Sequence, residues 1–290
     1  MIWLVGAGGL LGRELRRQLV AANRPHVATG RDVDVRDPHA VRAAVARWRP
    51  RWIVNTAAFT AVDRAEAEPE AAHRLNAVAP GLLAEAAHDR KARLLHLGTD
   101  YVFDGRREAP YQEDDPPSPL GVYGRTKAEG EARVHAAGDE HLVVRTSWLH
   151  GPTGPCFVRT VLARLAGAEP VAVVEDQHGR PTYTADLAAA LREVLDRDDV
   201  PGGTLHAAGE GVCTWYELAR AVRDGALQRG LLPRAAPLTA RATASGPGIA
   251  PRPPHAVLAL DRLRATLGRS LPTWQDGLAR HLDRLQGSDG

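Results

Sequence analysis

Lysine, cysteine and aromatic residues are all scarce in this 290-residue chain. Of its 37 basic residues only Lys91 and Lys127 are lysines, and the other 35 are arginines. The preference for arginine accompanies many alanines and 21 prolines, a bias typical of a G+C-rich genome. A lysine that persists in such a composition can mark a place where a guanidinium could not substitute for a compact ammonium, whereas Lys91, in a polar turn, is expected to be a solvated charge.

Each further shortage excludes a class of protein. Cys156 and Cys213 are far apart and form no CxxC pair, which argues against a disulfide framework and a thiolate zinc site. The net charge of +2 gives no strong field for nucleic acid or an anionic membrane. No apolar run approaches the roughly 18–20 residues of a membrane span, and no signal peptide precedes the first apolar run. We expect a cytoplasmic protein that binds neither nucleic acid nor membrane.

Short apolar runs alternate with helical patterns in the first two-thirds of the chain. This alternation is typical of βαβ crossovers and of a parallel sheet with helices on both faces. The predicted strands are Ile2–Val5, His26–Thr29, Trp52–Asn55, Arg93–Leu97 and Leu142–Arg145. The predicted helices are the segment that contains Leu10 to Leu19, Pro38–Trp48, Ala77–His88 and Tyr123–Ala136.

The pattern changes after about residue 150. A strand over Val171–Val174, a helix over Ala185–Asp196, a short strand near Leu205 and helices over Thr214–Gln228 and Pro272–Leu285 suggest a smaller α/β lobe. Residues 233–254 are rich in Pro, Ala, Thr and Gly, without periodicity, and are predicted to form a loop or an ordered meander. The sequence therefore predicts an α/β protein. A Rossmann-like, doubly wound dinucleotide-binding domain covers residues 1–150. A sugar-nucleotide lobe covers mainly residues 151–290, and the chain can cross between the two.

A glycine-rich turn follows the first strand directly and opens a helix. Gly6, Gly9 and Gly12 give the spacing GxxGxxG, with Gly8 as an extra glycine. Such glycines allow a tight turn, a close approach of the backbone to a pyrophosphate, and close contact between helix and strand. The helix N-terminus offers free N–H groups to phosphate. We expect a dinucleotide here, and the spacing is typical of short-chain dehydrogenases.

The end of the second strand bears on the choice of nicotinamide. An acidic residue about 20 residues after the glycine turn would bind the ribose 2′-hydroxyl of NAD. This chain has Thr29, Gly30 and Arg31 there, and the guanidinium of Arg31 suits a 2′-phosphate. Asp32 follows at once, so NADPH is favoured and NADH stays as the alternative.

Tyr123 and Lys127 are four residues apart at the start of a predicted helix, so both lie on one face. With a pKa of ~10, a tyrosine is a poor acid–base group at neutral pH, and a neighbouring ammonium lowers that pKa. Thr99 ends the fourth strand, where the carboxyl edge of a parallel sheet places ligands. Its hydroxyl can hold a carbonyl oxygen that the tyrosine protonates.

Together with the glycine turn, several longer segments carry a resemblance to a known family. They are Asn55–Asp63, Thr99–Gly105, Tyr123–Glu131, Arg145–Trp148, Asp176–Thr182 and Gly211–Trp215. In these segments the chain resembles the dTDP-4-dehydrorhamnose reductases, which are extended short-chain dehydrogenases, over about residues 1–285. The resemblance implies reduction of the C4 ketone of dTDP-4-dehydro-L-rhamnose to dTDP-L-rhamnose. It implies Tyr123 as general acid, Lys127 lowering the pKa of Tyr123 and holding the nicotinamide ribose, and Thr99 orienting the carbonyl.

The resemblance also implies binding residues, carried over position by position. Those expected at the pyrophosphate are Gly9, Leu10 and Leu11, beside Gly6 and Gly12. Asp34 and Val35 would flank the adenine, and Ala57, Ala58 and Thr60 would line the cofactor after the third strand. Those expected at the sugar are Val62, Thr99, Asp100, Tyr123 and Trp148.

Three positions depart from the family pattern. Gly98 stands where serine is common, which suggests added backbone freedom beside Thr99; Phe59 replaces a frequent polar residue or tyrosine; and Ala256 replaces a serine in the segment Arg252–Leu258. The departure at Ala256 leaves the substrate open. A 4-ketoreductase of a related dTDP-deoxysugar in secondary metabolism, such as a dihydrostreptose pathway, also fits these residues.

Two further classes of protein share the glycine turn. One is a non-catalytic, dinucleotide-binding regulatory subunit, and the second is an epimerase or dehydratase of the same superfamily. Mg²⁺ is suggested by the family only, since no metal-binding pattern is visible in the sequence. Monomer and homodimer are both open.

Overall fold

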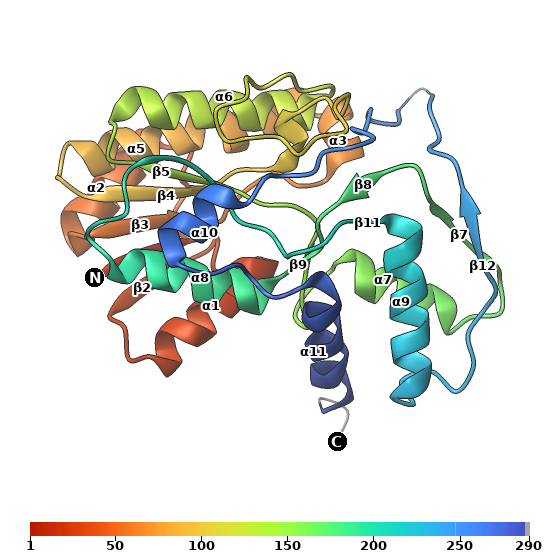
Figure 1. Cartoon of the computed structure of the whole chain (residues 1–290). Helices are drawn as coiled ribbons and strands as arrows, with labels where there is room; N and C mark the ends of the chain where they lie inside the picture. The colour runs from red at the N-terminus through yellow and green to blue at the C-terminus, as the bar shows by residue number, and fades with distance from the viewer. Residues whose placement is uncertain (247, 288–290) are drawn as a thin grey trace.

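The computed structural model describes residues 1–246 and 248–287, and a six-stranded parallel sheet forms its centre (Figure 1). The strand order is β10-β5-β4-β3-β1-β2, and every neighbouring pair is parallel. The strands are β1 (Ile2–Val5), β2 (His26–Thr29), β3 (Trp52–Asn55), β4 (Arg93–Leu97), β5 (Leu142–Arg145) and β10 (Gly203–His206). The first five have the predicted bounds. The order reverses between β1 and β3, and such a switch point opens a crevice for ligands at the carboxyl ends of the strands.

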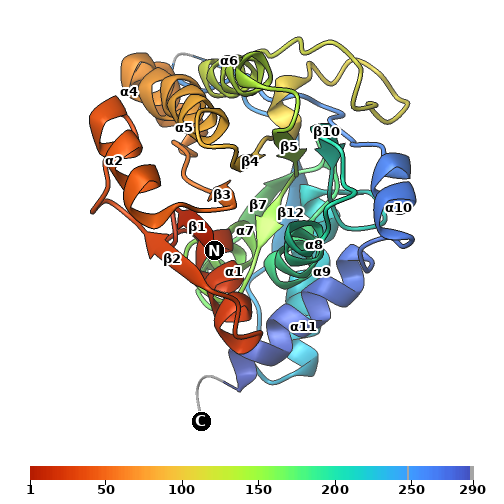
Figure 2. The same ribbon diagram turned by 90° about the vertical axis from the view of Figure 1, so that its left-hand side faces the viewer.

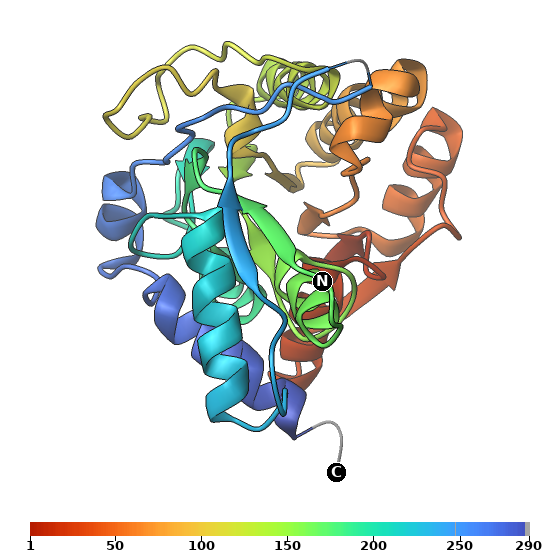
Figure 3. The same ribbon diagram turned by 90° about the vertical axis from the view of Figure 1, so that its right-hand side faces the viewer.

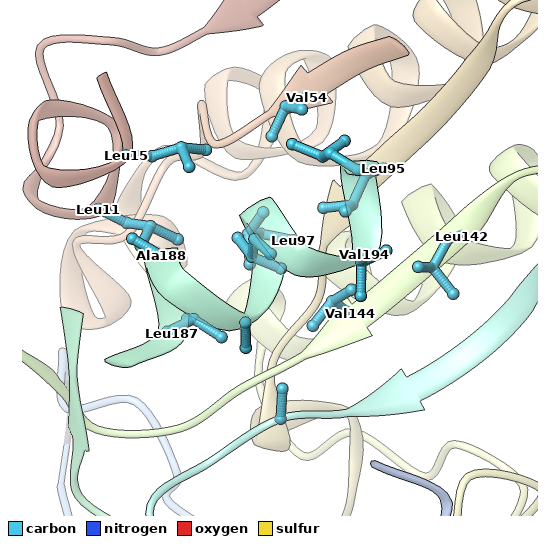
Figure 4. Close-up of a cluster of buried hydrophobic side chains, with 14 of the residues drawn as sticks. Leu11, Leu15, Val54, Leu95, Leu97, Leu142, Val144, Leu187, Ala188 and Val194 are labelled. Atoms are coloured by element: carbon cyan, nitrogen blue, oxygen red, sulfur yellow. The ribbon is translucent and has the colours of Figure 1, made fainter. Parts of the chain in front are cut away.

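Helices cover both faces of this sheet, which confirms the doubly wound α/β fold (Figure 2). One face carries α2 (Pro38–Trp48), α5 (Ala79–His88) and α6 (Val122–Ala137). The other carries α1 (Leu10–Ala21), α8 (Thr184–Asp196) and α10 (Asp261–Leu267). Figure 4 shows the apolar side chains of this second layer, where Leu11 of α1 lies beside Ala188 of α8 and Val194 of α8 lies beside Val144 of β5. Burial of these apolar side chains from both sides stabilises the sheet.

The chain before α5 contains more helix than predicted. Two short helices, α3 (Val62–Ala67) and α4 (Pro69–His73), are followed by a π-helical turn, Arg74–Val78, which leads directly into α5. Pro80 has no N–H to donate to the carbonyl of Asn76, so the regular helical ladder cannot continue through this point. A Cβ on Gly130 of α6 would lie 2.0 Å from that carbonyl oxygen, so this glycine lets the two helices approach closely.

The smaller lobe is built on a pair of parallel strands, β7 (Val171–Val174) and β12 (Leu238–Arg241) (Figure 3). Its core lies between α7 (Phe157–Leu165), α9 (Trp215–Gln228) and α11 (Trp274–Gln286). The prediction of a loop or an ordered meander over residues 233–254 did not include the strand β12. Three of the four β12 side chains are exposed, so this strand shows no apolar pattern and is formed by its backbone pairing with β7.

Four two-residue strands connect the lobe with the sheet. They pair as β6 (Leu149–His150) with β9 (Thr182–Tyr183), and β8 (His178–Gly179) with β11 (Cys213–Thr214). In the described part of the chain, no helix combines the length and apolar character that crossing a membrane requires.

Two elements beyond residue 150 belong to the main sheet. Strand β10 pairs with β5, with Leu205 opposite Val144, and α8 packs against α1. The sequence predicts both elements in the smaller lobe, and this placement is wrong. A short apolar strand is equally compatible with either sheet, because its sequence does not specify its pairing partner.

Candidate active site

One cleft of about 1110 Å³ opens at the carboxyl ends of β1, β3 and β4 and extends to the smaller lobe. It brings together all the site residues predicted from the sequence except Gly12. They are Gly6, Gly9, Leu10, Leu11, Arg31, Asp34, Val35, Ala57, Ala58, Thr60, Val62, Thr99, Asp100, Tyr123, Lys127 and Trp148.

The glycine turn has the backbone geometry of a phosphate-binding loop. Gly6 has φ +78°, and a Cβ there would lie 2.6 Å from the backbone nitrogen of Ala57. Gly9 precedes α1 without a side-chain cap, so the first N–H groups of the helix face the cleft unoccupied by protein side chains. Gly12 lies one turn inside, where a Cβ would be 2.3 Å from the carbonyl oxygen of Gly6. Gly12 therefore serves the contact of helix and strand and does not line the cleft.

Charged residues after β2 form the far end of the cleft. Arg31 lines it, whereas Asp32 lies outside the lining and its carboxylate accepts the N–H of Gly30 at 2.6 Å. Asp34 is held by Arg36 through bonds of 2.8 and 2.9 Å, which lower the pKa of Asp34 to about 2. Arg36 also lines the cleft, although it was not predicted from the sequence as a site residue. Of the two arginines that line this end of the cleft, Arg36 is therefore paired with Asp34 and Arg31 is not.

Thr99 and Tyr123 face each other at the inner part of the cleft. Thr99 lies two residues after the end of β4 and caps a short 3₁₀ turn, Asp100–Val102, by accepting the N–H of Tyr101 at 3.2 Å. Its hydroxyl donates to Oδ1 of Asp100 at 3.0 Å. The ring of Tyr123, in the first turn of α6, packs edge-on against Tyr101 with 5.4 Å between centroids. Burial raises the pKa of Tyr123 to about 12, and a hydrogen bond from Thr99 opposes this rise.

Lys127 lies one helical turn after Tyr123 and is completely buried. Its Nζ donates to the carbonyl oxygen of Leu97 and lies 3.1 Å from Nε2 of His96. Burial lowers the pKa of Lys127 to about 8. We expected Lys127 to lower the pKa of Tyr123, but the structure does not show this effect. The amine of Lys127 is directed to β4, and burial of the phenol determines the pKa of Tyr123. His96 is a partner that no sequence signal indicated.

A buried ion pair supports the threonine from behind. Arg145 of β5 donates to Glu131 of α6 at 2.8 Å, and both side chains are at most 5% exposed. The backbone N–H of Thr99 also acts on the carboxylate of Glu131 and opposes the rise of its pKa that burial causes. A Cβ on Gly98 would lie 2.4 Å from Oε1 of Glu131. Gly98 therefore makes room for the ion pair, and its φ lies outside the left-handed region.

Aromatic rings form the wall on the side of the smaller lobe. Trp148 has a left-handed backbone, φ +46°, and stacks on Trp215 with 3.5 Å between centroids and 7° between planes. Phe157 packs against Trp215 at 4.4 Å. A Cβ on Gly179 would lie 2.4 Å from Trp148, so the indole is held from two directions. Trp215 and Phe157 line the cleft but were missed, because an aromatic residue at a helix start reads as core.

The segment Arg252–Leu258 lies outside the cleft lining. Arg252 bonds to Asp63 at 2.8 Å and to the hydroxyl of Tyr101, and Ala256 is buried. Ala256, which replaces a serine of the family, therefore packs in the interior and does not line the cleft. Among the described residues, no group of three or more His, Cys, Asp or Glu side chains could hold a metal ion, so nothing here supports Mg²⁺.

Known proteins resemble the chain over its whole length. The family model described as RmlD substrate binding domain matches residues 1–287. This chain belongs to the dTDP-4-dehydrorhamnose reductase family. A dTDP-4-dehydrorhamnose reductase of Streptomyces griseus is 42% identical over 99% of this chain and 95% of its own.

Two further matches are to a 4-ketoreductase of another dTDP-linked sugar and to a solved structure with NADP. A probable dTDP-4,6-dihydroxy-2-methyloxan-3-one 4-ketoreductase of Streptomyces antibioticus is 46% identical, over 96% of this chain and 93% of its own. The solved dTDP-4-dehydrorhamnose reductase of Bacillus anthracis, in complex with NADP, superposes with a TM-score of 0.91 at 31% identity, covering 98% of both chains. As a member of this family, the protein is an oxidoreductase that uses a nicotinamide dinucleotide.

Proposed function

We propose that this reductase converts the C4 ketone of dTDP-4-dehydro-L-rhamnose to the hydroxyl of dTDP-L-rhamnose, with NADPH as reductant. The observation that carries the proposal is the meeting of Thr99, Tyr123 and Lys127 at one end of a cleft whose other end is a dinucleotide turn. The activity for which the Streptomyces griseus relative is named supports the choice of substrate.

The glycine turn fits a dinucleotide because Gly6 and Gly12 leave no space for side chains and the N-terminus of α1 faces the cleft. Gly9, Leu10 and Leu11 would hold the pyrophosphate, and Asp34 and Val35 would flank the adenine. When bound, the nicotinamide supplies the hydride. Ala57, Ala58 and Thr60 would line the cofactor next to β3.

Arg31 supports NADPH over NADH. It lines the cleft and forms no ion pair with an aspartate among the described residues, while the carboxylate of Asp32 accepts the N–H of Gly30. A guanidinium suits the extra phosphate of NADPH. The NADP in the Bacillus anthracis relative supports the same choice.

Tyr123 acts as the general acid. Because burial holds its pKa at about 12, the phenol carries its proton throughout the neutral range. Thr99 donates to the carbonyl oxygen and so places it beside the phenol. Lys127, which lines the cleft one helical turn away, would hold the nicotinamide ribose. Val62, Asp100 and Trp148 would contact the sugar.

The proposal is tested by mixing purified protein with NADPH and dTDP-4-dehydro-L-rhamnose. We expect loss of the reduced nicotinamide absorbance and one chromatographic product, dTDP-L-rhamnose. A Tyr123→Phe variant should lose about 10²–10⁴-fold in kcat and still bind the dinucleotide. Full activity of Tyr123→Phe would refute the mechanism.

A second candidate substrate has an observation in its favour. The relative at 46% identity is named as a 4-ketoreductase of a different dTDP-linked sugar. Turnover of such a deoxysugar, with none of dTDP-4-dehydro-L-rhamnose, would keep the roles of Thr99 and Tyr123 and replace the substrate.

A further inference from the structure

The carboxyl group of Asp100 has an unusual environment at the inner end of the cleft. The residue lines the cleft but is only 2% exposed. Its Oδ1 accepts the Thr99 hydroxyl, whereas Oδ2 is buried and has no hydrogen-bond partner among the described residues. An ionised carboxylate with a buried, unpaired oxygen is costly in free energy. A proton on Asp100 removes that cost.

The Thr99 hydroxyl connects Asp100 with Tyr123. A hydroxyl has one proton to donate and two lone pairs to accept. The N–H of Tyr101 takes one lone pair at 3.2 Å, and the proton is shared between two acceptors, Oδ1 of Asp100 and the phenol oxygen of Tyr123. When Thr99 donates to one of these oxygens, its second lone pair can accept from the other. The three oxygens therefore form an unbroken line.

The charged surroundings do not favour ionisation of Asp100. The titratable groups that face it are Tyr101, from its own 3₁₀ turn, and Tyr123 of α6, and the negative charge of Asp100 raises the pKa of both. Farther out, Arg252 bonds to Tyr101 and Glu131 acts on Tyr123. Burial raises the pKa of Asp100 to about 7 against the hydrogen bond from Thr99. Both protonation states are thus accessible near neutral pH, as a proton relay requires.

We propose that Asp100 supplies, through the hydroxyl of Thr99, the proton that returns to Tyr123 after each reduction. This role rests on the proposed ketone reduction, and it differs from the sugar contact that the family resemblance implies.

The steps balance in atoms and charge. The O–H bond of Tyr123 breaks as its proton passes to the carbonyl oxygen of the substrate, whose carbon receives the hydride. The Thr99 proton moves to the phenolate, and the proton of the Asp100 carboxyl group moves to the Thr99 oxygen. Asp100 is left as a carboxylate and regains a proton from solvent. Each turnover consumes one hydride and one proton.

The relay is tested with two variants of Asp100. Asp100→Asn keeps the shape but has no acidic proton, so kcat should fall by about 10²-fold. Dinucleotide binding, followed by tryptophan fluorescence, should not change. Asp100→Ala should regain activity as formate is added, because formate fits the vacated space, whereas formate should not rescue Asp100→Asn. The exposed Asp114→Asn is the control and should behave as wild type.

Two results would overturn the relay. One is an Asp100→Asn variant that keeps kcat and only raises KM for the sugar, since Asp100 would then serve as a substrate contact alone. The other is an Asp100→Ala rate that formate leaves unchanged.

A substrate-free measurement separates this proposal from the proposed function. In ¹³C-aspartate-labelled protein, the carboxyl signal absent from Asp100→Asn should titrate near pH 7. Titration of that signal below about pH 5, as for ordinary carboxyl groups, would overturn the relay whatever the substrate. Failure of the wild type to reduce any dTDP-4-keto sugar would instead refute the proposed function.

Discussion

Nζ of Lys127 lies 3.1 Å from Nε2 of His96, in a chain of contacts that begins at Asn55. Asn55 accepts the N–H of Ala57 through Oδ1, which turns its NH₂ group towards Nδ1 of His96 at 3.0 Å. Nδ1 must then accept, so in the neutral ring Nε2 carries the hydrogen and points at Lys127. A donor in this place favours the uncharged amine, as does the burial that lowers the pKa of Lys127.

The buried lysine should make stability depend on pH in the alkaline range. Its pKa is about 8 in the folded protein, against 10.5 for the solvated side chain in the unfolded chain. Between these values the unfolded state binds the extra proton, so the free energy of unfolding rises with pH, by up to about 3 kcal/mol. Urea unfolding at about pH 7.5 and about pH 9.5 should show this rise relative to Lys127→Met. Parallel pH curves for the two proteins would contradict it.

The two glycines at the start of α1 should differ sharply in tolerance to alanine. A Cβ at Gly12 would meet the Gly6 carbonyl oxygen at 2.3 Å, whereas a Cβ at Gly8 would meet nothing within 4 Å. We expect Gly12→Ala to lower the free energy of unfolding by about 1–3 kcal/mol because the helix must move away from the strand. Gly8→Ala is the matched control and should unfold at the wild-type urea concentration. Equal midpoints for the two variants would contradict this account.

The two ion pairs of helix α6 should also differ. Glu131→Gln breaks the buried pair with Arg145 and leaves a guanidinium without its charge partner, which should cost about 3–5 kcal/mol. Glu129→Gln breaks the exposed contacts with Arg133 and His73 and should cost less than about 1 kcal/mol. Denaturant unfolding of the two variants measures the difference. Because Glu131 also holds the backbone of Thr99, kcat should fall with stability only at this position.

Arg31→Ala should weaken NADPH much more than NADH. Loss of one charge-assisted bond to a phosphate amounts to about 1.5–3 kcal/mol, or roughly 10–100-fold in Kd. Arg36→Ala serves as comparison, since Arg36 lines the same cleft but is paired with Asp34. Titration of each dinucleotide by fluorescence gives the four constants. An equal loss for NADPH and NADH in Arg31→Ala would remove the argument for the 2′-phosphate.

The predictions for the sheet and the cleft were most accurate where a local sequence pattern is compatible with a single structure. Buried parallel strands are continuous apolar runs, so Ile2–Val5 and Trp52–Asn55 were bounded correctly. The spacing of Gly6, Gly9 and Gly12 indicated the turn because few other residues fit it. Family resemblance then brought Thr99 and Tyr123 to the same place.

Partners that lie far apart in the chain could not be predicted. His96 lies in a strand of otherwise mainly apolar residues, and nothing in that strand marks it out. Only the packing of α6 on β4 brings it next to Lys127. Trp215 reaches Trp148 from another lobe, and a local pattern contains no information about that stacking. The exposed strand β12 has no pattern of its own because its partner β7 supplies the apolar face.

The late arrival of β10 has a consequence for how the chain folds as it is synthesised. Until residue 206 has emerged, β5 is an open edge, and until α8 has emerged, Leu11, Leu15 and Leu19 of α1 have no helix to cover them. An open strand edge beside bare leucines invites association with other chains. The first 150 residues should therefore be aggregation-prone when expressed alone, and the nascent protein passes through this exposed stage on every ribosome.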